Sequence, residues 1–143
     1  MKKALLVLLA FILMMPLAMK AQYLTEGFES TSSGLPAGWV QVSGTVSVDN
    51  SSSYTCTGSR SLKFSNSLSN LVALPVLSVE ISMVELTINT RPEGTYENSG
   101  NFQIGYMTDV TNASSFVPVQ TVRYSDFHGA CGEITATFTA LIK

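Results

Sequence analysis

Alternating apolar and polar residues recur along the chain after its first twenty positions. The clearest run begins at Glu133, where every second residue from Ile134 to Ile142 is apolar and three threonines lie between them. A period of two is that of a strand with one buried and one solvated face. Runs of this kind predict strands at 39–42, 45–48, 61–64, 82–89, 101–107, 116–122 and 133–142.

A further apolar segment, 71–77, is interrupted by Pro75. Because proline has no N–H to donate to a strand ladder, we expect this segment at a sheet edge or at a bulge. The intervening segments are rich in Ser, Gly, Asn and Pro, and 91–100 is a long polar loop. Short strands separated by such turns predict an all-β fold, either a sandwich or a barrel.

The beginning of the chain has the organisation of a secretory signal peptide, which we place at residues 1–21. Lys2 and Lys3 precede an apolar run at 4–15, and cleavage is expected after Ala21. The run of 12 residues is too short for a transmembrane helix. We therefore expect residues 22–143 to form one secreted domain.

Cleavage would leave an acidic domain. The whole chain has a net charge of −2, and the leader carries three lysines and no acidic residue, so the remainder has −5. An acidic surface repels phosphate groups, which argues against nucleic acid and anionic membranes as partners. No later segment is long and apolar enough to span a membrane, so we expect no membrane insertion after cleavage.

The chain has two cysteines, Cys56 and Cys131, which lie 75 residues apart. Export would place them where a disulfide can persist. A bridge closing that loop would stabilise the fold by roughly 4 kcal/mol in the chain-entropy model. Because a sequence does not contain the geometry of pairing, a bridge and two free thiols both stay open at this point.

The segment from Glu26 to Trp39 joins a Phe-Glu pair to a Leu-Pro-Ala-Gly turn and the only tryptophan. Pro36 fixes its own φ and Gly38 allows a sharp turn, so Trp39 is delivered to one defined place. Burial of a large aromatic side chain is strongly favourable. We therefore expect Trp39 to anchor the core.

Four segments stand in the order found in a known group of domains. They are Phe28-Glu29, Leu35-Pro-Ala-Gly-Trp39, Gly58-Ser-Arg-Ser-Leu62 and the stretch 105–119. The chain from Glu26 to Val122 resembles the choice-of-anchor J or cleaved-adhesin domains of Bacteroidota, relatives of MAM and concanavalin-like domains. The resemblance implies an antiparallel two-sheet β-sandwich of jelly-roll type with a non-catalytic binding or adhesion role on secreted or cell-surface proteins.

The resemblance also implies a structural calcium ion. In such domains the Glu after Phe, here Glu29, commonly meets an Asp-Asp-Ile/Val motif of the last strand at a cation. This chain contains no Asp-Asp pair. We therefore expect a C-terminally truncated copy that lacks its last strand or strands and exposes an unpaired sheet edge. Asp49 and Asp109 are alternative oxygen ligands, although loop aspartates more often bond their own backbone.

Candidates for catalysis are few, and we expect no enzyme. His128 is the only histidine and lies near Ser125 and Asp126. A triad is recognised by geometry rather than by proximity in sequence, and no nucleophile elbow, H-E-x-x-H or P-loop is present. A loop histidine is the better interpretation.

Two pairs of carboxylates deserve comparison with those of glycosidases. Glu80 and Glu85 have opposite strand parity, so one sheet face would not hold both. Glu93 and Glu97 fall in a Gly-containing loop. Solvated loop carboxylates explain both pairs.

Four aromatic residues in expected loops would either form a platform for sugars or cap the core: Tyr54, Tyr96, Tyr124 and Phe127. The expected function is binding or adhesion, with carbohydrate or an extracellular protein as the partner. The alternatives are an accessory fragment of a secreted glycosidase or peptidase, and a structural module of a larger surface protein.

Overall fold

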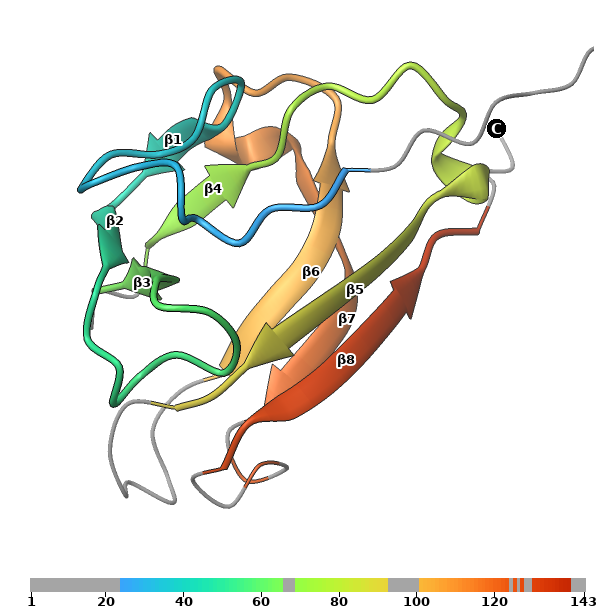
Figure 1. The fold of residues 1–143 in the computed structure, drawn as a ribbon. Helices are drawn as coiled ribbons and strands as arrows, with labels where there is room; N and C mark the ends of the chain where they lie inside the picture. Colours follow the sequence, from blue (N-terminus) through green and yellow to red (C-terminus); the bar gives the residue numbers. More distant parts are fainter. Residues whose placement is uncertain are drawn as a thin grey trace, which may run out of the picture.

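A computed structural model describes residues 24–65, 69–92, 101–123, 125, 127 and 130–139, so the expected signal peptide lies outside the described residues. The described chain contains eight strands and two 3-10 helices (Figure 1). They are β1 (Val40–Ser43), β2 (Val46–Asp49), β3 (Ser61–Phe64), β4 (Leu71–Ala73), η1 (Ile81–Met83), β5 (Glu85–Thr90), β6 (Asn101–Met107), η2 (Ala113–Ser115), β7 (Phe116–Arg123) and β8 (Gly132–Thr137).

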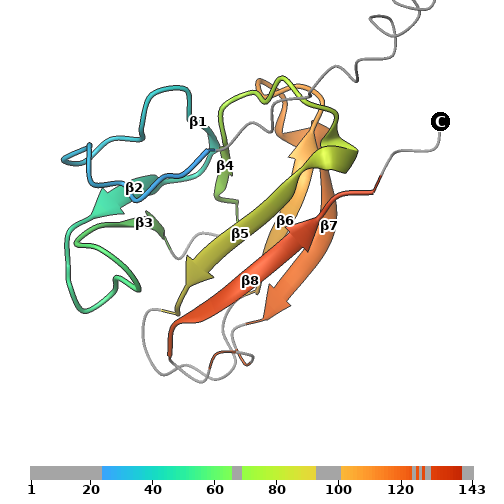
Figure 2. The same ribbon diagram turned by 45° about the vertical axis from the view of Figure 1, so that its right-hand side comes forward.

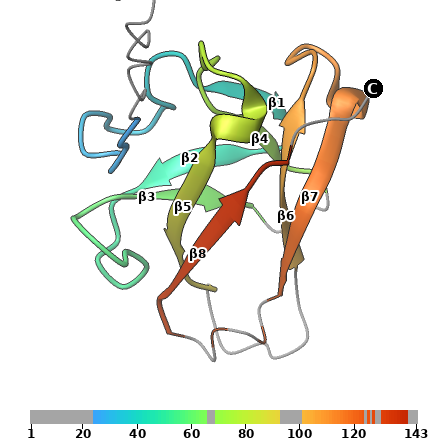
Figure 3. The same ribbon diagram turned by 90° about the vertical axis from the view of Figure 1, so that its right-hand side faces the viewer.

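The strands form four antiparallel two-stranded ribbons, β1–β4, β2–β3, β5–β8 and β6–β7. The two long ribbons, β5–β8 and β6–β7, lie in separate layers, and the two short ribbons lie to one side of them (Figures 1 and 2). Figure 3 shows the same separation from a third angle. The prediction of an all-β, antiparallel fold is confirmed.

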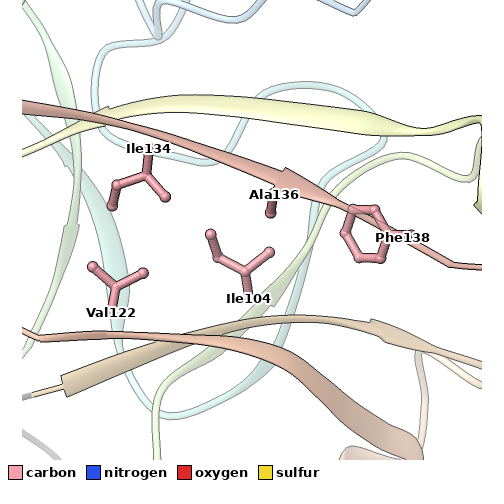
Figure 4. Packing of buried hydrophobic residues seen from close by; sticks show 5 residues of the cluster. All are labelled: Ile104, Val122, Ile134, Ala136 and Phe138. Atoms are coloured by element: carbon pink, nitrogen blue, oxygen red, sulfur yellow. The ribbon is translucent and has the colours of Figure 1, made fainter.

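The main core lies between the two long ribbons. Its buried members project from β6 and β7 on one side and from β8 and the residue after it on the other (Figure 4). Partly buried side chains of β5 and β6 pack against this cluster, so the faces expected from the period of two are the buried ones. The buried members are Ile104, Val122, Ile134, Ala136 and Phe138.

Three strands are shorter than the alternation predicted. Residues 82–83 belong to η1, where Met83 N–H donates to the Glu80 carbonyl (2.9 Å), and the strand begins only at Glu85. The apolar segment 71–77 is a strand only as far as Ala73, before Pro75. The last strand ends at Thr137, although Phe138 continues its buried face, and residues 140–142 of the expected strand lie outside the described residues. Alternation therefore marks which side chains are buried rather than where the ladder ends.

A bulge interrupts the β6–β7 ribbon. Ile104 pairs with Gln120 and Gly105 with Pro118, so Val119 is an extra residue in β7. A Cβ atom on Gly105 would lie 2.2 Å from the Val117 carbonyl oxygen. The missing side chain at 105 therefore allows the close approach of β7, and the bulge accommodates a proline that has no ladder N–H.

Trp39 does not anchor the main core. It is half-buried and outside the buried cluster, and its ring makes an edge contact with Phe28 at 5.4 Å between centroids. The turn before it forms as expected, with Trp39 N–H donating to the Pro36 carbonyl (3.1 Å) and Gly38 at φ 83°. Side chains from β5 to β8 fill the space between the two long ribbons. Trp39 therefore packs within its own segment, 26–39.

Candidate functional site

The loop Asn50–Arg60 joins β2 to β3, and several residues singled out from the sequence lie in it or beside it. In the β2–β3 ribbon Ser47 pairs with Lys63 and Asp49 with Ser61. Asp49 and Lys63 are therefore diagonal neighbours on one face, and the Asp49 Oδ2 to Lys63 Nζ distance is 3.6 Å. Asp49 Oδ1 also accepts from the Ser51 N–H (2.7 Å), so the turn-forming role expected of Asp49 is present.

Tyr54 lies beside this ion pair at the surface. Its side chain is 37% exposed, and the Lys63 ammonium lies 5.6 Å from the ring centroid. Tyr54 N–H donates to the Ser51 carbonyl (3.0 Å), a turn that sets the position of the ring. An exposed aromatic ring next to a cation and a carboxylate combines an apolar surface with hydrogen-bonding groups.

The other expected aromatic candidates differ from Tyr54. Phe127 is half-buried and packs against the main core, and a Cβ atom on Gly132 would lie 2.0 Å from its ring. Phe127 therefore caps the core. Tyr96 and Tyr124 lie outside the described residues. Tyr54 is the described member of the four that is exposed.

Glu29 binds the far end of the same loop. Its Oε1 accepts from the N–H groups of Ser59 (2.7 Å) and Arg60 (3.1 Å), and its Oε2 accepts from the Ser59 hydroxyl. These hydrogen bonds, with that of the Ser59 side chain first, lower the pKa of Glu29. Gly58 has φ 68°, and a Cβ atom there would lie 2.3 Å from Glu29 Oε1. The absence of a side chain at Gly58 therefore leaves room for the Glu29 carboxylate beside this turn.

The described surroundings of Glu29 are those of a hydrogen-bonded carboxylate, and calcium at this residue stays a prediction. Calcium takes six to eight oxygen ligands, whereas the described neighbours of the Glu29 carboxylate are two N–H groups and one O–H group that point toward it. Asp109, the alternative ligand, accepts from the Thr111 hydroxyl (2.7 Å) and N–H (2.9 Å), bonds that lower its pKa. Within the described ranges, no group of three or more His, Cys, Asp or Glu is arranged to hold a metal ion.

A disulfide joins the loop to the start of β8. The structure bonds Cys56 to Cys131, with 5.6 Å between their Cα atoms. That separation is usual for disulfides. Because Cys131 immediately precedes Gly132, the bridge fixes the Asn50–Arg60 loop relative to the long β5–β8 ribbon.

Among the carboxylates considered for catalysis, the structure describes Glu80 and Glu85. Glu80 precedes η1 and Glu85 begins β5, and both are exposed. Four others lie outside the described residues: Glu93, Glu97, Asp126 and His128. No helix in the described part of the chain is long and apolar enough to cross a membrane.

The sequence marks Asp49 and Tyr54 separately and gives no signal that singles out Lys63. Lysine is common on strands with alternating apolar and polar residues, so the sequence around Lys63 does not mark it as a site residue. Its place beside Tyr54 depends on the register of β2 against β3, which spans an 11-residue loop between Asp49 and Ser61.

The fold and the loop define an all-β antiparallel protein that displays an aromatic and ionic cluster beside a disulfide. Comparisons of this chain with family models, curated proteins and solved structures found no match.

Proposed function

We propose that this chain is a secreted or cell-surface bacterial binding module, a β-sandwich of jelly-roll type without catalytic activity. Its ligand is a carbohydrate bound at the Asn50–Arg60 loop. The observation that carries the proposal is the exposed ring of Tyr54 beside the Asp49–Lys63 ion pair. An extracellular protein that presents sugar-like polar groups is the related alternative partner.

The chemistry of a sugar suits these three side chains. The C–H face of a pyranose is apolar and stacks on an aromatic ring, while its hydroxyl groups donate to carboxylates and accept from ammonium groups. Tyr54 supplies the ring, Asp49 the acceptor and Lys63 the donor. The disulfide holds the middle of the loop at Cys56, and the Glu29 hydrogen bonds hold its far end at Ser59 and Arg60. Both restraints lower the entropy lost when a ligand orders the loop.

The experiment is a glycan array with the purified protein, followed by Kd measurements on any sugar that binds. Tyr54→Ala should weaken binding by about tenfold or more, whereas Tyr54→Phe, which keeps the ring, should weaken it less. Met83→Ala is the matched control, because Met83 is an exposed apolar side chain (58%) in η1. Unchanged affinity in Tyr54→Ala with an intact fold would refute the Tyr54 site.

Two other functions stay open to the same experiment. An accessory fragment of a secreted glycosidase or peptidase would turn over a substrate, and the activity would disappear in Glu93→Gln or His128→Ala. A structural module of a larger surface protein would give a blank array and would co-purify with envelope proteins. Structural calcium at Glu29 and a truncated last strand stay predictions from the resemblance.

A further inference from the structure

The long ribbons leave two strand edges facing each other. Among the described strands, β8 pairs only with β5, and β7 pairs only with β6. Their other edges border a groove of about 370 Å³, lined by Gln120–Val122 of β7, Glu133–Thr135 of β8 and Phe127. Because successive side chains of a strand point to opposite faces, a wall of three consecutive residues is an edge and not a face.

The two edges differ in how well they are protected from pairing. Natural proteins protect exposed edges with proline, lysine and bulges. The β7 edge has two of these devices, Pro118 and the bulge at Val119. The β8 edge has neither proline nor lysine, its one charged residue is Glu133 near its start, and its six residues pair with β5 in an uninterrupted register. Within the described residues, the β8 edge is therefore the one open to another strand.

We infer that β8 pairs, antiparallel, with β8 of a second copy of this chain, and that the two copies form a continuous sheet β5–β8–β8–β5. The two-fold axis passes beside Thr135, so Thr135 faces its own equivalent. A closed two-fold contact of this kind uses the same surface on both copies and stops at a dimer.

The sequence of β8 is complementary to itself in this register. Glu133 faces Thr137 of the second copy, so no like charges are opposed, and Ile134 faces the smaller Ala136 on the buried side. On the solvated side Thr135 would meet a threonine, as it already does within one copy, where its hydroxyl lies 3.3 Å from that of Thr87. An arbitrary partner strand would have to reproduce this pattern, whereas a second copy supplies it.

The test is the mass of the purified protein in solution, measured by sedimentation or light scattering over a wide concentration range. We expect a monomer–dimer equilibrium. Thr135→Lys and Thr135→Glu should each raise the dimer Kd by about fivefold or more, because the two-fold axis opposes the new charges. An equimolar mixture of the two variants should restore the dimer as a heterodimer.

The matched control is Thr121→Lys, an exposed threonine of the protected β7 edge, which should leave the dimer Kd unchanged. Circular dichroism checks that each variant is folded. The inference is overturned if the unmodified protein is monomeric at every concentration, or if Thr135→Lys dimerises like the unmodified protein. It is equally overturned if the mixture of variants does not restore the dimer.

Discussion

Glu29 links two loops that lie far apart in the sequence. Its carboxylate joins a segment near the start of the domain to Ser59 and Arg60, which lie 30 and 31 residues later. Arg60 completes the link, since its Nη1 donates to the Ser32 carbonyl (3.2 Å). A carboxylate that accepts backbone N–H groups is stabilised in its charged form. In the described structure, hydrogen bonds to the Glu29 carboxylate therefore hold two loops together.

The protein should become less stable as pH falls, in part because Glu29 becomes protonated. Its hydrogen bonds lower its folded pKa from the ordinary value, so its contribution is fully present above the unfolded pKa of about 4.3 and is lost as pH falls through the folded pKa. We expect Glu29→Gln to lower Tm at neutral pH and to flatten the decline of Tm below about pH 4.3. Thermal unfolding across a pH series measures both effects.

Glu80→Gln is the control for that series, since Glu80 is an exposed glutamate whose side chain makes no cap hydrogen bond to η1. It should leave Tm and its pH dependence unchanged. The same series with calcium and with a chelator tests the cation. A Tm that rises with calcium, and does so only while Glu29 is present, would support the predicted calcium site instead of a purely hydrogen-bonded Glu29.

At the scale of elements, the β6–β7 ribbon depends on a glycine opposite a proline. Gly105 of β6 lies directly after the register shift and pairs with Pro118 of β7. An added Cβ atom would meet the Val117 carbonyl at 2.2 Å and the Phe116 ring at 2.8 Å. The Val117 carbonyl and the Phe116 ring both belong to β7. Because Val122 of the same strand is buried, β7 is not free to move away from an added Cβ atom.

Gly105→Ala should therefore destabilise the fold by roughly 1–3 kcal/mol through overpacking. Urea unfolding followed by circular dichroism measures the free energy. Gly34→Ala is the control, because an added Cβ atom there meets nothing within 4 Å, and its effect should stay within about 0.5 kcal/mol. Equal stability of the two variants would show that β7 moves away at little cost.

The sequence predicted the buried faces of these elements better than their ends. Ile134, Ala136 and Phe138 are buried as the period of two required, yet the ladder stops at Thr137. Residue 83 was expected in a strand and lies in η1. Burial follows from hydrophobicity at each position, whereas a ladder ends where its partner strand departs, and that partner is distant in sequence.

At the scale of the whole molecule, the Cys56–Cys131 bridge connects the short-ribbon side to the long ribbons. It links the loop after β2 to the first residue before β8 across 75 residues of sequence. Within the part of the chain that the structure describes, the buried side chains are few and of moderate size. A covalent link that restricts the unfolded chain is therefore a large contribution to this fold.

Removing the bridge should lower stability by roughly 4 kcal/mol. The double variant Cys56→Ser with Cys131→Ser, and the unmodified protein under reducing conditions, should show the same loss in urea unfolding. Thiol titration of the denatured, non-reduced protein should find no free thiol. Two titratable thiols would contradict the bridge, and a reduced protein that is as stable as the oxidised one would contradict its contribution.

Sequence alone determined the class of this fold, because alternation of apolar and threonine residues depends only on the two faces of a strand. It also marked Glu29, Tyr54 and the two cysteines as residues of interest. The tertiary structure decided their roles. Whether Glu29 meets donors or a cation, which charged side chains flank Tyr54, and which edge of β8 is open all depend on contacts between distant segments, and no local pattern contains those contacts.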